Sequence, residues 1–169
     1  NGGISRPRCP YNLPTNETVI KDLLDNNRLT AHFQPIVSLQ QAKVFAYEAL
    51  CRIVDPNPFD NIEELFHQAR ICGRTLQLDM RCRQNGLALA AAQGLNDREA
   101  LLFLNICPTS LLHPDHSAGT TGILANKYSI PKHTIVLEIA SGSPSTTISA
   151  SPAAANISAP SRSAPFSMR

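Results

Sequence analysis

Short apolar segments that alternate with amphipathic ones are the feature of this sequence that most limits its fold. Between Gln40 and Ile139 the pattern predicts strand, helix, helix, strand, helix and strand. The strands are expected at residues 43–50, 100–106 and 132–139, and the helices at residues 61–70, 76–93 and 120–128. We expect the second and third strands to be buried on both faces, because they are almost continuously apolar. Alternation of this kind is typical of an α/β domain with a largely parallel sheet.

A further strand and a short helix are expected before this alternating region. Residues 29–39 suit a strand and lead into a turn at Gln40-Gln41. They are therefore close enough to residues 43–50 to pair with them as a hairpin. A short helix is expected to begin near Asn16 or Glu17, with Asn16 as its N-terminal cap.

Size and charge exclude several classes of protein. A chain of 169 residues can hold one ordinary domain with a core. The net charge is only +2, with no long basic run, so we expect no nucleic-acid polymer as a partner. No apolar run approaches the roughly 20 residues that span a bilayer, so we predict no membrane segment and a cytoplasmic location. Residues 1–15 are expected to be a linker or the end of an upstream domain.

The cysteines point to free thiols. Five are present, an odd number without a CxxC pair. This pattern argues against both a disulfide framework and a zinc site. We expect reduced thiols of a cytoplasmic protein, several of them packed in the core.

The composition changes abruptly at Ala140. Residues 140–169 are mostly Ser, Ala, Pro and Thr and contain no Leu, Val, Asp, Glu or Lys. Such a segment buries too little apolar surface to offset the entropy of ordering it. We therefore expect the domain to occupy residues 16–139 and to be followed by a low-complexity tail, disordered or out of frame. Translating the encoding DNA in its other frames beyond codon 139 tests the second alternative.

Polar residues lie at equivalent places near the carboxyl ends of three predicted strands. Glu48 ends the apolar run 44–47, Asn105 ends the run 101–104, and Glu138 ends the run 134–137. Ligands bind at the carboxyl ends of parallel strands in barrels and open α/β sheets. Two carboxylates and an amide oxygen would form an oxygen-only site that favours Mg²⁺ or Mn²⁺ over zinc. A metal ion there could activate a bound water and orient a phosphodiester.

Each of these three residues also has a purely structural alternative. Glu48 could cap a turn, and Asn105 could tie a loop to the backbone. Glu138 could form an ion pair with Lys132 or with an arginine. Taken singly, these alternatives are the more frequent outcome. Three polar strand ends in one short domain nevertheless favour a site.

Four segments carry a resemblance to a known family, in that family's order and at compatible spacing. They are Phe33-Gln34-Pro35-Ile36-Val37, Tyr47-Glu48-Ala49-Leu50-Cys51-Arg52, Phe103-Leu104-Asn105-Ile106 and Ile135-Val136-Leu137-Glu138-Ile139. Together they resemble the successive motifs of the EAL domain, a family of bacterial phosphodiesterases that hydrolyse cyclic di-GMP to pGpG. The tripeptide Glu-Ala-Leu alone recurs by chance, whereas the four motifs in order are specific. The resemblance covers roughly residues 16–139.

The resemblance implies a fold, a cofactor and a set of site residues. The family's fold is a modified TIM barrel whose first strand runs antiparallel to the others, and its ligand is cyclic di-GMP. The family's metal ligands fall on Glu48, Asn105 and Glu138, and its substrate contacts fall on Gln34, Leu50 and Arg52. Mg²⁺ or Mn²⁺ is the implied cofactor, and Glu48 the implied catalytic residue. The resemblance also leaves room for a homodimer through this domain and for an upstream sensory domain of unknown type.

The later motifs of the family have no counterpart here. They supply a paired Asp-Asp, a lysine, a further glutamate and a late glutamine, whereas no Asp, Glu, Lys or Gln follows Glu138 in this sequence. A complete barrel takes about 250 residues, so we expect a truncated barrel that stops near its fourth strand. We therefore expect this chain to be inactive by itself, as a fragment or frameshift product. The alternative is a non-catalytic module that binds cyclic di-GMP or another protein.

Overall fold

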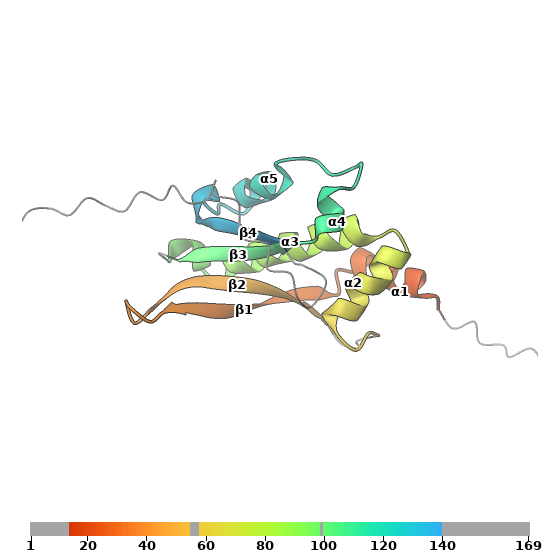
Figure 1. The fold of residues 1–169 in the computed structure, drawn as a ribbon, viewed down its shortest axis with the longest axis horizontal. Coiled ribbons are helices and arrows are strands. Elements are labelled where there is room, and N and C mark those ends of the chain that lie inside the picture. The colour runs from red at the N-terminus through yellow and green to blue at the C-terminus, as the bar shows by residue number, and fades with distance from the viewer. Residues whose placement is uncertain (1–13, 55–57, 99, 140–169) are drawn as a thin grey trace, which may run out of the picture.

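A four-stranded sheet in the order β1-β2-β3-β4 is the framework of the computed structural model (Figure 1). The structure describes residues 14–54, 58–98 and 100–139. The strands are β1 (Leu29–Ser38), β2 (Lys43–Ile53), β3 (Leu101–Ile106) and β4 (Ile135–Ile139). β1 pairs antiparallel with β2, whereas β2 with β3 and β3 with β4 are parallel pairs. The predicted α/β class with an antiparallel first strand is therefore confirmed.

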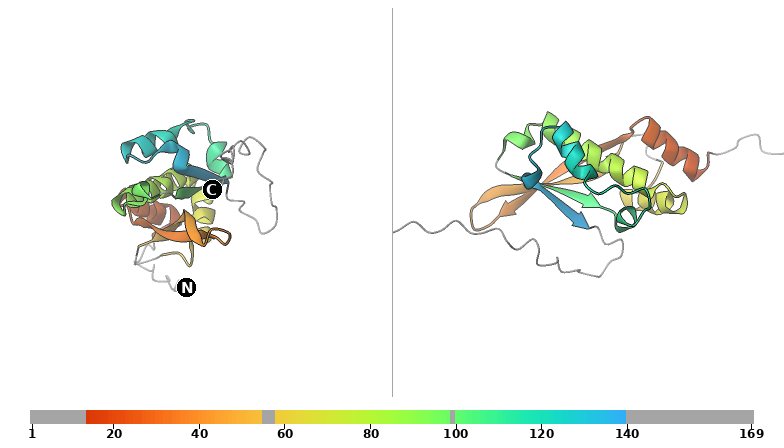
Figure 2. Two further views of the ribbon diagram at one scale, coloured as in Figure 1. Left: turned by 90° about the vertical axis from the view of Figure 1, so that its left-hand side faces the viewer. Right: turned by 90° about the horizontal axis from the view of Figure 1, so that it is seen from above.

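Helix α3 (Thr75–Ala92) lies along one face of this sheet and packs against β1, β2 and β3 (Figure 2). The shorter helices are α1 (Asn16–Asp25), α2 (Ile62–Ile71), α4 (Pro108–Leu111) and α5 (Thr120–Lys127). Two short 3-10 turns, Leu95–Asp97 and Lys132–Thr134, precede β3 and β4. Helices α1 and α2 sit side by side at one end of the sheet (Figure 1).

Two apolar clusters between helices and strands form the core. One joins α1 and α2 to the start of β1, and the other lies between α3 and the middle of β2 and β3. Gly86 allows α3 to approach the sheet closely, because a Cβ at this position would lie 3.2 Å from Leu104 and 3.3 Å from Ala49. The helix therefore covers one face of β2 and β3.

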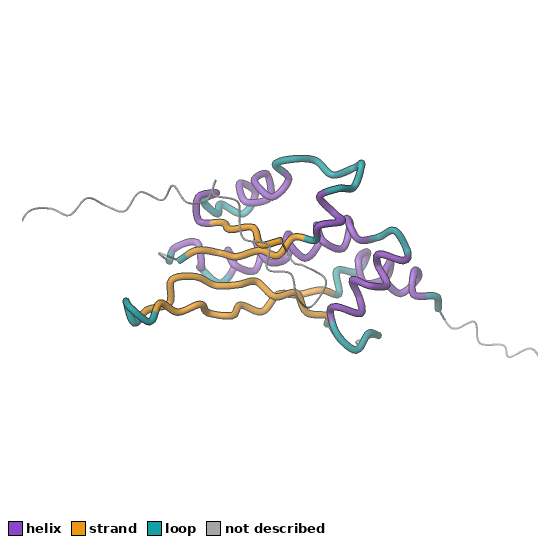
Figure 3. The backbone as a smooth tube through the Cα atoms, in the orientation of Figure 1, coloured by secondary structure: helices purple, strands orange, loops and turns teal. Residues whose placement is uncertain are grey.

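The β1–β2 hairpin is longer than predicted and extends past the start of β3 at its turn (Figure 3). β2 continues to Ile53 instead of ending near Leu50, because β1 pairs with it along its length and Leu29 is the partner of Ile53. Glu48 consequently lies inside β2. The prediction that it ends a strand is wrong.

The N-terminal cap of α1 also differs from the prediction. The Thr15 hydroxyl accepts a hydrogen bond from the backbone N–H of Thr18 at 3.3 Å, so Thr15 is the cap. Asn16 is the first helical residue, and its amide donates to the Gln68 side chain at 2.8 Å. Asn16 therefore links α1 to α2.

Neither β3 nor β4 is buried on both faces, contrary to the prediction. In β3, buried residues alternate with partly exposed ones. β4 is at the edge of the sheet and is bordered only by β3 among the described strands, so Leu137 and Ile139 remain 46% and 60% exposed. Apolar composition predicted the strands correctly, but their burial depends on how many neighbours they have.

Both predicted flanking segments fall largely outside the described residues. These segments are 1–13 of the predicted linker and the whole of the predicted tail, 140–169. In the part of the chain that is described, no helix is both long and apolar enough to cross a membrane.

Candidate functional site

Strand alternation places the predicted site residues on the sheet face opposite α3. In β2, Tyr47 and Ala49 pack into the cluster beneath α3, so Glu48 points to the other face. In β3, Leu102 and Leu104 pack into the same cluster, and Asn105 therefore shares the face of Glu48.

Strand register then brings these residues together in pairs. Gln34 of β1 is the direct partner of Glu48 in β2. Asn105 of β3 is the direct partner of Glu138 in β4. Residues opposite each other on adjacent strands have their side chains on the same face, so each pair is a pair of neighbours.

A side-chain hydrogen bond joins the two pairs across β2 and β3. The Asn105 amide nitrogen donates to Oε1 of Glu48 at 2.8 Å. This bond turns the amide oxygen of Asn105 away from the carboxylate, which leaves that oxygen available as a ligand. The structural alternatives for both residues are not borne out, because each lies within a strand rather than in a turn or loop.

Glu138 is electrostatically linked to this pair. Partial burial raises the pKa of the Glu138 carboxyl, and the negative charge of Glu48 raises it further. Within the described residues Glu138 forms no ion pair, so the alternative of a bond to Lys132 or to an arginine is not observed. Two carboxylates that repel one another beside an amide oxygen are suited to a cation.

Replacing Glu48 with glutamine should lower the pKa of Glu138 towards its ordinary value of 4.5 without reaching it. The substitution removes the repelling charge, while the larger cause, partial burial, remains. An NMR titration of the glutamate carboxyl carbons measures the change. Glu17→Gln is the control, because Glu17 pairs with Arg74 at 3.2 Å and is not among the charges that shift the pKa of Glu138. A Glu138 pKa that does not respond to Glu48→Gln would contradict the coupling.

The raised pKa of Glu138 determines in which direction the stability of the fold changes with pH. Since the pKa of Glu138 is higher in the folded than in the unfolded chain, its favourable contribution is complete below the unfolded-state pKa. The contribution is lost as the pH rises through the folded-state pKa. In the unsubstituted chain, ionisation of Glu138 should therefore slightly lower the free energy of unfolding as the pH rises above about 4.5. Glu138→Gln should make this decrease smaller, as measured by urea unfolding at several pH values.

A groove of about 870 Å³ opens at the carboxyl ends of β2 and β3. It is lined by four of the six predicted site residues, Glu48, Leu50, Arg52 and Asn105. Gln34 and Glu138 occupy the same sheet face but do not line the groove. The other walls come from α2, α3 and α4.

Arg52 is the predicted phosphate ligand nearest the end of β2. Its side chain is exposed, and one guanidinium nitrogen donates to the carbonyl of Cys51 at 2.8 Å. That bond holds the guanidinium beside the strand at the groove, with its other N–H donors available to an anion.

A buried ion pair that sequence reasoning missed supports the groove. Arg83 donates to Oδ2 of Asp79 at 2.8 Å, and both side chains are almost fully buried, with 2% and 3% exposed. Oδ1 of Asp79 accepts the backbone N–H of Cys107 at 2.8 Å, which fixes the start of α4. Burial raises the pKa of Asp79, and the Cys107 N–H and the Arg83 guanidinium oppose that rise without cancelling it.

Arg83 also connects this network to α5. It donates a second hydrogen bond to the Thr121 hydroxyl in α5. The available sequence signal was the spacing of Asp79 and Arg83, since oppositely charged residues at i and i+4 on a helix form a pair. That spacing indicates an ion pair but does not indicate that the pair is buried.

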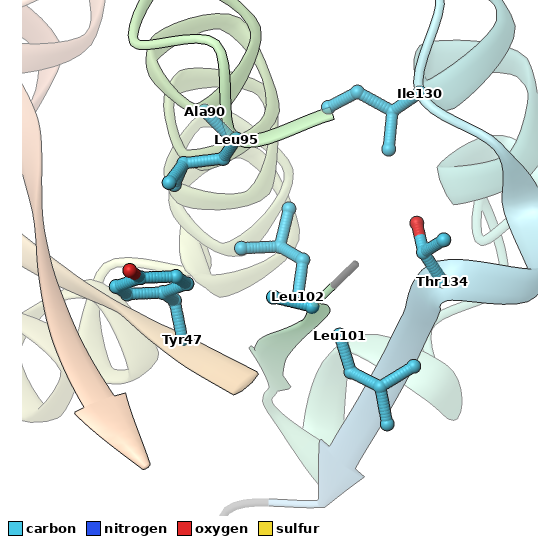
Figure 4. Close-up of a pocket in the computed structure, with 8 residues that line it drawn as sticks. Tyr47, Ala90, Leu95, Leu101, Leu102, Ile130 and Thr134 are labelled. Carbon is cyan, nitrogen blue, oxygen red and sulfur yellow. The ribbon is translucent and has the colours of Figure 1, made fainter. Parts of the chain in front are cut away.

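A second, smaller pocket of about 10 Å³ lies at the opposite end of the sheet, around the start of β3 (Figure 4). Tyr47, Leu101, Leu102, Ile130 and Thr134 contribute to its lining. It has room for about one water molecule. Most of its lining is apolar, which makes it a packing gap rather than a candidate site.

The chemistry of the donor set fits a hard divalent cation. Glu48, Asn105 and Glu138 offer oxygen atoms alone, which Mg²⁺ and Mn²⁺ prefer and zinc does not. Within the described residues no group of three or more His, Cys, Asp or Glu side chains is placed to hold a metal ion, and the candidate set has two carboxylates beside the Asn105 amide.

A known protein family matches most of the sequence. The sequence model of the EAL domain matches residues 17–158. The chain therefore belongs to the EAL domain family. The matched range continues beyond Ile139, where we expected the domain to end, into residues that the structure does not describe. The predicted domain boundary stays a prediction.

Solved structures of EAL domains share the fold. The EAL domain of FimX from Pseudomonas aeruginosa bound to c-di-GMP is 24% identical, with a TM-score of 0.59 over 74% of this chain and 50% of that one. The standalone EAL protein of Vibrio cholerae O395, also bound to c-di-GMP, is 28% identical, with a TM-score of 0.52 over 66% of this chain and 44% of that one. The EAL enzyme Bd1971 is 20% identical with a TM-score of 0.59, and 35% of its length is covered.

The chain thus spans about half the length of the FimX EAL domain and about a third of Bd1971. The comparison with curated proteins gave no match.

Proposed function

We propose that the sheet face carrying Glu48, Asn105 and Glu138 is the first half of a cyclic di-GMP phosphodiesterase site. Its substrate would be cyclic di-GMP and its product pGpG. We further propose that this chain by itself binds the dinucleotide without hydrolysing it.

The observation that carries the proposal is the hydrogen bond from Asn105 to Glu48, at 2.8 Å. It joins two strands through side chains that could share a cation. The negative charge of Glu48 also raises the pKa of Glu138. A structural role for any one of the three would not require the other two nearby.

Glu48, Asn105 and Glu138 would hold Mg²⁺ or Mn²⁺ through oxygen atoms. When bound, that ion would supply an activated water and neutralise phosphate charge. The amide nitrogen of Asn105 orients the Glu48 carboxylate by its hydrogen bond. Such support keeps a ligand in position at little entropic cost when the cation arrives.

Arg52, Leu50 and Gln34 are the proposed contacts to the dinucleotide. The Arg52 guanidinium suits a phosphate because it can donate two parallel hydrogen bonds. Leu50 offers apolar surface within the groove. Gln34 lies directly across from Glu48 and can both donate to and accept from a phosphate or a guanine edge. The relatives from Vibrio cholerae and Pseudomonas aeruginosa were solved with c-di-GMP bound, which supports this ligand.

Hydrolysis should need more than these groups. After Glu138 the sequence contains no Asp, Glu, Lys or Gln, so it has no counterpart to the family's Asp-Asp, lysine, later glutamate and glutamine. Binding without hydrolysis is also favoured by the exposure of Glu138 at the sheet edge, where a cation would be only partly enclosed.

Binding and turnover can be measured on one sample. The purified chain is incubated with labelled cyclic di-GMP and Mn²⁺, retention of the label is followed by equilibrium dialysis, and pGpG is followed by chromatography. We expect saturable retention and no pGpG above the protein-free background.

Two other outcomes would be decisive. Formation of pGpG that disappears in Glu48→Ala would make this chain an active phosphodiesterase and refute our expectation of inactivity. Absence of saturable retention would overturn the proposal that this groove binds the dinucleotide.

A further inference from the structure

Two cysteines in the wall of the groove are in direct contact. Cys82 of α3 donates an S–H hydrogen bond to the sulfur of Cys51 in β2, with the sulfur atoms 2.9 Å apart. Both thiols are free in the structure and partly exposed. They are 31 residues apart in sequence, so the fold brings them together.

The surroundings of the pair leave it accessible from one side. Both cysteines pack against the apolar cluster of α1 and α2, and both also line the groove of about 870 Å³. A small oxidant can therefore reach the sulfurs through the groove. The charged side chains that act on the pair are Arg52 on β2 and Asp79 and Arg83 on α3.

The contact also makes the two thiols unequal. The hydrogen bond from Cys82 lowers the pKa of Cys51, and the positive charge of Arg52 lowers it further. The same hydrogen bond, together with burial, raises the pKa of Cys82. Cys51 is thus suited to attack an oxidant, and Cys82 to react second.

We propose that Cys51 and Cys82 are a peroxide-sensitive dithiol that closes to a disulfide in the wall of the groove. The sulfurs already lie 2.9 Å apart, so they need to approach by less than about 1 Å to reach the S–S bond length of about 2.05 Å. This inference goes beyond the proposed function and does not depend on it.

The oxidant is a hydroperoxide, and the reaction balances in two steps. The Cys51 thiolate attacks the terminal oxygen, an S–O bond forms, the O–O bond breaks, and the released alkoxide or hydroxide takes up a proton. Cys82 then attacks the sulfur of the resulting sulfenic acid, the S–O bond breaks, and water leaves with the Cys82 proton. The two thiols lose two electrons in total, and the hydroperoxide accepts them.

The new bond would tie β2 to α3 beside the site. Cys51 lies between Leu50 and Arg52, two of the proposed dinucleotide contacts. Oxidation would therefore restrain the strand that carries these contacts and Glu48. It would also cross-link a strand to a helix, which removes conformational freedom from the unfolded chain.

Peptide mass spectrometry tests the proposal directly on the purified chain. The reduced protein is treated with hydrogen peroxide, unreacted thiols are blocked with iodoacetamide, and trypsin is added. Trypsin releases Cys51 on residues 44–52 and Cys82 on residues 82–83. We expect these two peptides to be linked through a disulfide, with two fewer free thiols than the five of the reduced chain.

Single substitutions separate the roles of the two thiols. In Cys82→Ser, dimedone should trap a sulfenic acid at Cys51. In Cys51→Ser, Cys82 should be oxidised at least about tenfold more slowly than Cys51 is in Cys82→Ser, because burial still raises the pKa of Cys82 and the thiolate is the reactive form. Cys72→Ser and Cys107→Ser are matched controls that should leave the 44–52 to 82–83 link intact.

The wild-type result decides the proposal even if a variant fails to fold. Absence of the linked peptide after other thiols have been oxidised would overturn it. A disulfide from Cys51 to Cys72 or Cys107 in its place would overturn it equally.

Discussion

Asp79→Ala is expected to lower the free energy of unfolding by about 3–5 kcal/mol, a large part of the stability of a small domain. The substitution leaves the Arg83 guanidinium buried without its carboxylate, and only 2% of that side chain is exposed. It also removes the acceptor for the Cys107 N–H at the start of α4. The loss is measured as a shift in the midpoint of urea unfolding.

The chain contains a matched control for this experiment. Lys21 and Asp25 form another i, i+4 ion pair, but their side chains are 62% and 59% exposed. Asp25→Ala should change the stability by no more than about 0.5 kcal/mol, because exposed pairs contribute little. Should Asp79→Ala prevent folding altogether, Asp79→Asn keeps an acceptor for the Cys107 N–H and should retain part of the stability. Equal effects of Asp79→Ala and Asp25→Ala would contradict the structural role of the buried pair.

Glu48→Gln should have the second large effect, weakening the binding of Mn²⁺ by about 100-fold or more. Substitutions that only support a metal ligand already cost about 10–100-fold in affinity, and we propose Glu48 as a ligand itself. Glutamine keeps the size of the side chain and can still hydrogen-bond to Asn105, so the change is mainly one of charge. The EPR signal of free Mn²⁺ during a titration measures the affinity.

Glu63→Gln is the control for this prediction. Glu63 lies in α2 and lines the same groove, but it is not one of the proposed ligands. It should leave the affinity within about twofold of the unsubstituted chain, since Glu63 is exposed and its charge is screened by water and salt. Equal weakening by both substitutions would show a general attraction of the groove for cations rather than a site at Glu48.

Local sequence patterns were sufficient for the order of the elements and for part of the site. Alternating residue types predicted each major helix and strand to within a few residues, and the antiparallel first strand was implied by family resemblance. The same alternation places Glu48 and Asn105 on one face of adjacent parallel strands, where the hydrogen bond of 2.8 Å joins them.

Features that depend on distant partners were not predictable in this way. The extension of β2 to Ile53 follows from pairing with Leu29, which is far away in sequence. The burial of Asp79 and Arg83 depends on α4 and α5 covering them, because a charged pair on a helix usually faces water. β4 was expected to be buried because it is apolar, yet its edge position leaves it exposed.

The contact between Cys51 and Cys82 is the clearest case of this limit. Sequence spacing argued against disulfides, and the structure indeed has free thiols at both positions. Only the packing of α3 on β2 brings the sulfurs within 2.9 Å of each other.

Calorimetric titration of the purified chain with cyclic di-GMP, with and without Mn²⁺, tests the central claim most directly. We predict saturable binding that requires the cation and that Glu48→Gln abolishes or weakens by about 100-fold, while Glu63→Gln binds normally. Binding that is equally strong without Mn²⁺ or in Glu48→Gln would contradict a metal-assisted dinucleotide site at Glu48, and so would a complete lack of binding.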